Sequence, residues 1–106
     1  MLFFSIKGDN KMKGYWIAIY KTIEDMSKLG NYGKKATQAI QDFGGKPLVR
    51  GGRYQTLEGT NIPRTVIWEF KDFETAINCY NSKEYQDAWS MAKNTTVRDL
   101  EIVEGV

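Results

Sequence analysis

Hydrophobic and polar residues follow two different periods in the first half of the chain. Residues 14–20 are aromatic and β-branched, which is typical of a strand. Between Leu29 and Phe43 the apolar residues recur every three or four positions, which predicts a helix with one buried stripe. Either Thr22 or Asp25 can cap its start, and Gly44-Gly45 can end it.

The middle of the chain predicts two further strands. Residues 46–57 favour a second strand, in which Gly51-Gly52 indicates a bulge or a close approach of backbone. A turn follows at residues 58–61. Residues 65–70, with Val66, Trp68 and Phe70 on one face, predict the third strand.

The last third of the chain completes the order of elements. Asp72 can cap a second helix, which Asn81-Ser82 interrupts and caps again, and residues 100–104 predict a final strand. The order β-α-β-β-α-β indicates an α+β, ferredoxin-like domain with a four-stranded antiparallel sheet. We assign residues 12–106 to this domain and residues 1–11 to an N-terminal extension.

Both faces of the predicted sheet are apolar. In the first strand, Ile17 and Ile19 point to one face while Trp16 and Ala18 point to the other. Helices on one face leave the second face open, and a large exposed apolar patch is unusual on a monomer. We therefore expect a homodimer, with a monomer that holds a ligand over its sheet as the alternative.

Composition narrows the possible functions. With 106 residues and a net charge of +2, the chain has room for one domain and lacks the basic surface of a nucleic-acid-binding protein. It contains no histidine, which excludes a Ser-His-Asp triad and the common zinc and haem sites. We expect no metal, cofactor, membrane span or nucleic-acid partner, and a cytoplasmic location in which Cys79 stays reduced.

Charged residues gather at the predicted hairpin between the second and third strands. Arg50 and Arg64 can hold a carboxylate there, while Glu58 acts as a base or orients an arginine. The alternative is a structural arginine–glutamate pair that stabilises the turn.

Aromatic residues on the helices form a second candidate group. Tyr32, Tyr80 and Tyr85, with Trp89, can line a small cavity between helices and sheet and bind an oxygenated ligand, Tyr80 serving as a proton carrier. The alternative is that these rings are core residues with one polar edge. Cys79 has no histidine partner, which favours an inert buried thiol over a nucleophile.

Several short motifs carry a family resemblance. The chain resembles the DUF1330 family from Met12 to Val106, in order and at matching spacing, through these pieces: Lys13-Gly14-Tyr15-Trp16, Phe43-Gly44-Gly45, Arg50-Gly51-Gly52, Leu57-Glu58-Gly59, Tyr80-Asn81-Ser82-Lys83-Glu84-Tyr85 and Val103-Glu104-Gly105. The resemblance implies a dimeric α+β barrel, in which two ferredoxin-like units pack sheet to sheet. Cys79 and Ala92 depart from the family, which often has Trp and Arg there.

Two functions are compatible with these observations. The first is a small dimeric domain that binds an anionic or aromatic molecule. The second is a cofactor-independent isomerase or monooxygenase of the dimeric α+β barrel type, a class that the resemblance brings in by fold alone.

Overall fold

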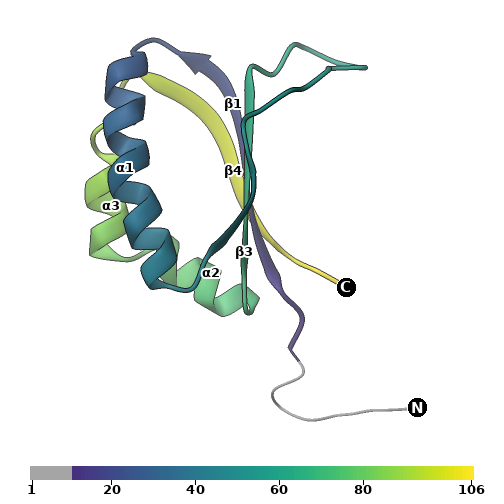
Figure 1. The fold of residues 1–106 in the computed structure, drawn as a ribbon, viewed down its shortest axis with the longest axis vertical. Coiled ribbons are helices and arrows are strands. Elements are labelled where there is room, and N and C mark those ends of the chain that lie inside the picture. The colour runs from purple at the N-terminus through teal and green to yellow at the C-terminus, as the bar shows by residue number, and fades with distance from the viewer. Residues whose placement is uncertain (1–10) are drawn as a thin grey trace.

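The computed structural model describes residues 11–106, which form one antiparallel sheet and three helices (Figure 1). The strands pair in the order β2-β3-β1-β4. The ferredoxin-like β-α-β-β-α-β order is confirmed, with the second helix divided in two. The elements are β1 (Gly14–Ile23), α1 (Met26–Asp42), β2 (Lys46–Arg50), β3 (Arg64–Phe70), α2 (Phe73–Tyr80), α3 (Lys83–Trp89) and β4 (Thr96–Glu104).

Helix α1 has clear start and stop signals. The carboxylate of Asp25, and not Thr22, caps the helix by accepting a hydrogen bond of 3.0 Å from the amide of Lys28. At the other end Gly44 takes a φ of +82°, and the amide of Gly45 donates to the carbonyl of Ile40 at 2.9 Å. This is a Schellman ending, which turns the chain directly into β2.

Helices α2 and α3 are separated by a second capping residue. Asp72 caps α2 by accepting from the amide of Thr75 at 2.8 Å. Ser82 caps α3 by accepting from the amide of Tyr85 at 3.1 Å. The interruption predicted at Asn81-Ser82 is therefore present, and it re-aims the chain so that Tyr85 enters the core.

Two strands differ in length from the prediction. Strand β2 ends at Arg50, because Gly51 and Gly52 have φ values of +73° and +87° and lead the chain off the sheet edge. Of the bulge or close approach that the sequence predicted at Gly51-Gly52, the bulge inside a longer strand is absent, and the side chain of Arg64 lies against Gly51. Strand β4 begins at Thr96, four residues before the predicted Leu100, because it stays paired with the last residues of β1.

All three helices lie on one face of the sheet, and the opposite face is open (Figure 1). The core lies between the helices and the inward-facing strand residues, of which Trp16, Phe70 and Trp68 are the largest. Within the part of the chain that the structure describes, no helix is long and apolar enough to cross a membrane. The predicted extension lies outside the described residues except for Lys11, whose ammonium group is 3.9 Å from the carboxylate of Asp72.

Candidate functional site

The register of the sheet gathers polar side chains at one end of its helix-covered face. Tyr20 of β1 lies directly between Arg64 of β3 and Arg98 of β4, so the three form one row across the sheet. The next row contains Arg50, Val66, Ala18 and Leu100. Because partners in adjacent strands share a face, three arginines and a tyrosine point toward the same region under α1.

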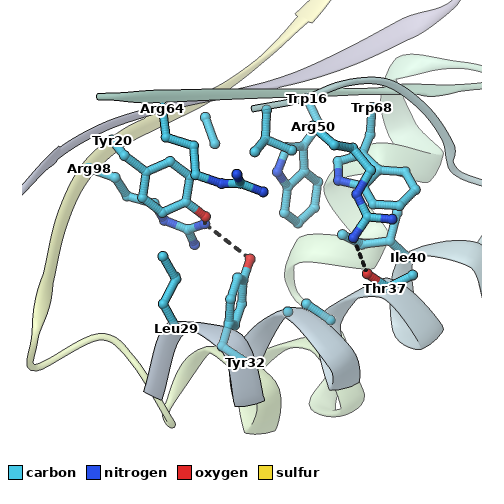
Figure 2. A pocket seen from close by; sticks show the side chains of 14 residues that line it. Trp16, Tyr20, Leu29, Tyr32, Thr37, Ile40, Arg50, Arg64, Trp68 and Arg98 are labelled. Carbon is cyan, nitrogen blue, oxygen red and sulfur yellow. Dashed lines mark hydrogen bonds between the residues drawn. The ribbon is translucent and has the colours of Figure 1, made fainter. Parts of the chain in front are cut away.

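A cavity of about 60 Å³ lies between this part of the sheet and α1 (Figure 2). The small side chain of Ala18 lies between the bulky neighbours Trp16 and Tyr20 on the same face, which leaves space above the strand. The lining consists of Trp16, Ala18, Tyr20, Leu29, Tyr32, Gly33, Ala36, Thr37, Ile40, Arg50, Arg64, Val66, Trp68 and Arg98.

The cavity continues into a groove of about 590 Å³ at the surface. Arg50, Arg64, Thr37 and Gly33 line both spaces, so they mark the entrance. Gly30 also lines the groove, and a methyl group added at either glycine would meet no atom within 4 Å. The two glycines weaken α1 by about 1 kcal/mol each relative to alanine, and in exchange they keep the entrance open.

Arg50 and Arg64 lie at the entrance with different neighbours. The Nη2 atom of Arg50 donates to the Oγ1 atom of Thr37 at 3.0 Å, and its guanidinium lies 5.4 Å from the ring centre of Trp68. The guanidinium of Arg64 points into the cavity (Figure 2). All ion pairs within 4.0 Å among residues 11–106 are made by lysines, so neither arginine is neutralised by a described carboxylate.

Arg98 is held by aromatic side chains at the inner end of the cavity. It donates to the hydroxyl oxygens of Tyr85, Tyr32 and Tyr20 at 2.6, 3.1 and 3.3 Å. Its guanidinium also lies 3.6 Å from the ring centre of Trp89. The hydroxyls of Tyr32 and Tyr85 are themselves hydrogen-bonded at 2.8 Å, which completes a cluster from β1, α1, α3 and β4.

Burial sets the protonation states in this cluster. It raises the pKa of Tyr32 well above its ordinary value and also raises the pKa of Tyr85. Burial acts to lower the pKa of Arg98, but the neighbouring oxygens of Tyr32 and Tyr85 outweigh it and the pKa rises. At neutral pH Arg98 therefore carries a positive charge and the phenols of Tyr32 and Tyr85 are neutral.

The structure brings together some of the residues predicted for a site and separates others. Arg50, Arg64 and Tyr32 line the cavity, and Tyr85 contacts it through the hydroxyl of Tyr32. Glu58 does not line it, because the loop of residues 51–63 leads away from the sheet and leaves this carboxylate exposed.

Tyr80 and Cys79 also lie away from the cavity. The ring of Tyr80 packs 5.9 Å from Trp16 and 5.6 Å from Tyr85. It is thus a partly buried core ring that packs behind Trp16 and Tyr85 and does not line the cavity. Cys79 is fully buried, and burial, with a smaller effect of Glu84, raises the pKa of its thiol to about 12. A thiol with that pKa is not a nucleophile at neutral pH.

Sequence reasoning missed Arg98, which is the centre of the aromatic cluster. The signal was present in the alternation of β4, where Arg98, Leu100 and Ile102 share one face. Because the strand was expected to begin at Leu100, its charged inward position was not recognised. Tyr20 was not predicted as a site residue either, although the alternation of the first strand places it on the same face as Trp16 and Ala18.

Acidic and sulfur side chains offer no metal site in the described region. No group of three or more Cys, Asp or Glu side chains in residues 11–106 is arranged to hold a metal ion. The lining of the cavity contains no carboxylate either, so its polar chemistry is that of guanidinium and hydroxyl groups.

The fold is similar to those of several solved structures. A protein of unknown function from Rhodopseudomonas palustris has a TM-score of 0.74 at 13% identity, with 92% of this chain and 85% of that chain covered. SnoaB, a cofactor-independent oxygenase from Streptomyces nogalater, has a TM-score of 0.58 at 3% identity, with 90% and 94% covered. A dimeric ferredoxin-like protein of unknown function from Bacteroides fragilis has a TM-score of 0.55 at 15% identity, with 88% and 96% covered.

Sequence comparison identifies a family. The sequence has no match among curated proteins. The family model described as a domain of unknown function, DUF1330, matches residues 13–106, which include every strand and helix of the domain. As the motifs in the sequence indicated, the chain belongs to the DUF1330 family.

Proposed function

We propose that this protein binds a small organic anion in the cavity between α1 and the sheet. The observation that carries the proposal is the lining itself, which contains Arg50, Arg64 and Arg98 and no acidic side chain. Positive charge that is not neutralised locally attracts anions, and guanidinium groups suit the planar geometry of a carboxylate. Arg98 is occupied by three phenols, so Arg50 and Arg64 at the entrance are the groups assigned to the ligand.

The test replaces each entrance arginine separately. We expect Arg50→Ala and Arg64→Ala to weaken binding of butyrate or benzoate, measured by calorimetry or NMR titration, by about tenfold each. Arg53→Ala is the matched control, because Arg53 lies in the exposed loop and does not line the cavity. Affinities that stay unchanged in both entrance variants would remove the anion site.

A cofactor-independent isomerase or monooxygenase is the alternative function. It is supported by similarity of fold to SnoaB, described as a cofactor-independent oxygenase, at 3% identity. Against it, Glu58 and Tyr80, the proton carriers expected from the sequence, do not line the cavity, and the raised pKa of Tyr32 makes this phenol a weak acid. Oxygen uptake that depends on an aromatic anion, and that Arg64→Ala abolishes, would favour the enzyme.

We also propose that two copies of the chain pair through the open face of the sheet. That face carries an apolar group in which Ile17 faces Ile67 across the β1–β3 pair with Ile19 and Val49 beside them, and Glu101 and Asp99 of β4 lie next to Ile17 and Ile19. The Bacteroides fragilis neighbour, which has the same fold, is described as dimeric, and this supports pairing of two copies. A stable pair of this kind buries about 1,600 Å² in total, which a four-stranded face can supply.

The pairing is tested by mass in solution. We expect native mass spectrometry and light scattering to give a dimer for the unmodified chain and a monomer for Ile17→Asp, since the aspartate would lie in the centre of the interface. Lys35→Asp, on the exposed side of α1, is the control and should remain dimeric. A monomeric unmodified chain would refute the pairing.

A further inference from the structure

The three phenol hydroxyls around Arg98 have more protons to donate than acceptors in reach. Each hydroxyl has one proton and two lone pairs, and Arg98 donates to all three oxygens. The hydrogen bond between Tyr32 and Tyr85 uses one of the three protons. Two phenol protons therefore remain without an acceptor among the hydrogen bonds of residues 11–106.

Burial decides which two protons these are. Either hydroxyl can donate in the Tyr32–Tyr85 bond, and we assign Tyr85 as the donor, because Tyr85 is fully buried, does not line the cavity and has no other described acceptor for its proton. Tyr32 then accepts from both Tyr85 and Arg98, and its own proton is left over. Tyr20 likewise accepts from Arg98 and keeps its proton. Tyr20 and Tyr32 both line the cavity, so their free O–H groups are available to a molecule inside it.

The polar lining of the cavity consequently donates and hardly accepts. Arg50 and Arg64 have only N–H groups, and the oxygen of Thr37 already accepts from Arg50. The hydroxyls of Tyr20 and Tyr32 lie at the inner end of the cavity beside Arg98, and the guanidinium of Arg64 extends into the cavity from the sheet (Figure 2). A fitting ligand needs a carboxylate for the arginines and a second, neutral acceptor oxygen for the phenols.

We infer that the ligand is a small oxo carboxylate, whose carboxylate binds Arg64 and Arg50 and whose carbonyl oxygen accepts from Tyr20 and Tyr32. This inference rests on the proposed anion binding and adds a second recognition element to it. A carbonyl oxygen accepts two hydrogen bonds and donates none, which matches two phenol donors. An amino group in its place would meet three guanidinium groups, and only the second lone pairs of the Tyr20 and Thr37 hydroxyls could accept from it.

The size of the cavity limits the ligand further. A volume of about 60 Å³ holds about four to six groups the size of a water molecule. The carbon chain would lie on Ala18 and Val66, the apolar part of the second row of the sheet. The shortest 2-oxo acids, of about three or four carbons, therefore fill the cavity, and longer chains extend into the groove.

The experiment compares three probes of the same carbon skeleton: 2-oxobutyrate, butyrate and 2-aminobutyrate. For the unmodified protein we expect 2-oxobutyrate to bind about tenfold more tightly than butyrate in calorimetry or NMR titration, and 2-aminobutyrate to bind more weakly than either. In Tyr20→Phe and Tyr32→Phe the ratio of the affinity for 2-oxobutyrate to the affinity for butyrate should fall toward one, because binding of 2-oxobutyrate weakens while the affinity for butyrate is retained. Tyr54→Phe, in the exposed loop, is the matched control and should keep the full preference.

The outcomes separate this inference from the proposal on which it rests. Equal affinities for 2-oxobutyrate and butyrate, or a preference that survives both phenylalanine substitutions, would overturn the oxo carboxylate and leave the anion site standing. Failure of all carboxylates to bind would overturn the anion site itself. If Tyr32→Phe does not fold, as judged by circular dichroism, Tyr20→Phe decides the result, since that substitution leaves the Tyr32–Tyr85 bond intact.

Discussion

Replacing Arg98 with methionine should destabilise the protein far more than a surface substitution does. The guanidinium joins β4 to β1, α1 and α3 through Tyr20, Tyr32 and Tyr85, and it lies on the face of Trp89. Methionine has a similar length and can fill part of the space, so the variant mainly loses hydrogen bonds and the cation–π contact.

The magnitude follows from the individual contacts. The hydrogen bond of 2.6 Å to Tyr85 has a charged donor and contributes about 1.5–3 kcal/mol, and the contact with Trp89 adds about 0.5–2 kcal/mol. The hydroxyl of Tyr20 loses its described donor, which costs about 1 kcal/mol or more. Relief of the desolvation of the guanidinium offsets part of this loss. The net loss is about 3 kcal/mol, which lowers Tm by roughly 12–24 °C for a domain of this size.

Urea unfolding followed by tryptophan fluorescence measures the effect. Arg53→Met is the matched control and should change the free energy of unfolding by less than about 0.5 kcal/mol. Arg98→Met, Arg53→Met and the unmodified chain are compared at one protein concentration, because pairing would link stability to concentration. If Arg98→Met and Arg53→Met were equally stable, the aromatic cluster around Arg98 would not contribute to the fold as the distances indicate.

Three further predictions concern other parts of the chain. Gly51→Ala should weaken butyrate binding, because the added methyl group collides with the Nη1 atom of Arg64. Gly52→Ala is the control: both glycines have a positive φ, so each substitution should cost about 1 kcal/mol of stability, but the space around Gly52 is open and the affinity should be kept. Cys79 should resist a thiol reagent at about pH 8 until the protein unfolds in urea, given its burial and raised pKa, and rapid labelling of the native protein would contradict this. Hydrogen bonds from Thr75 lower the pKa of Asp72 below its ordinary 3.8, so the stability that its carboxylate contributes is complete above about pH 4 and is lost as the pH falls through the lowered value. In Asp72→Asn the urea midpoint should therefore change less between about pH 5 and pH 2 than in the unmodified chain. An equal change in both would exclude Asp72 as a source of the pH dependence.

The fold could be predicted largely because its local signals agree with one another. Asp72 and Ser82 each lie at the start of an apolar helical period, and Gly44-Gly45 follows the end of one. In such places capping chemistry and hydrophobic period give the same boundary. Arg50 and Arg64 could also be paired from the sequence, because a hairpin brings its two ends together whatever the loop does.

The parts that failed depend on contacts between distant residues. Glu58 was expected beside Arg50, but the direction of its loop depends on the left-handed turns at Gly51 and Gly52, which local sequence does not determine. Arg98 was missed because the start of β4 is set by pairing with the end of β1 and not by its own mixed composition. The cavity requires Ala18 to lie under α1, and only the packing of helix on sheet reveals that.

If the proposed ligand binds in the cavity, the size of the side chain at position 18 sets the size of the molecule that fits. Its methyl group is the smallest inward side chain of β1, and the space above it is bounded by rings that belong to the core. A valine or leucine at this position would fill that space from below while the arginines and phenols stay in place. Glycine would deepen it. On the proposed function, a substitution at this one position would change chain-length selectivity while the arginines and phenols stay in place, so position 18 is the first to vary in an engineered binder.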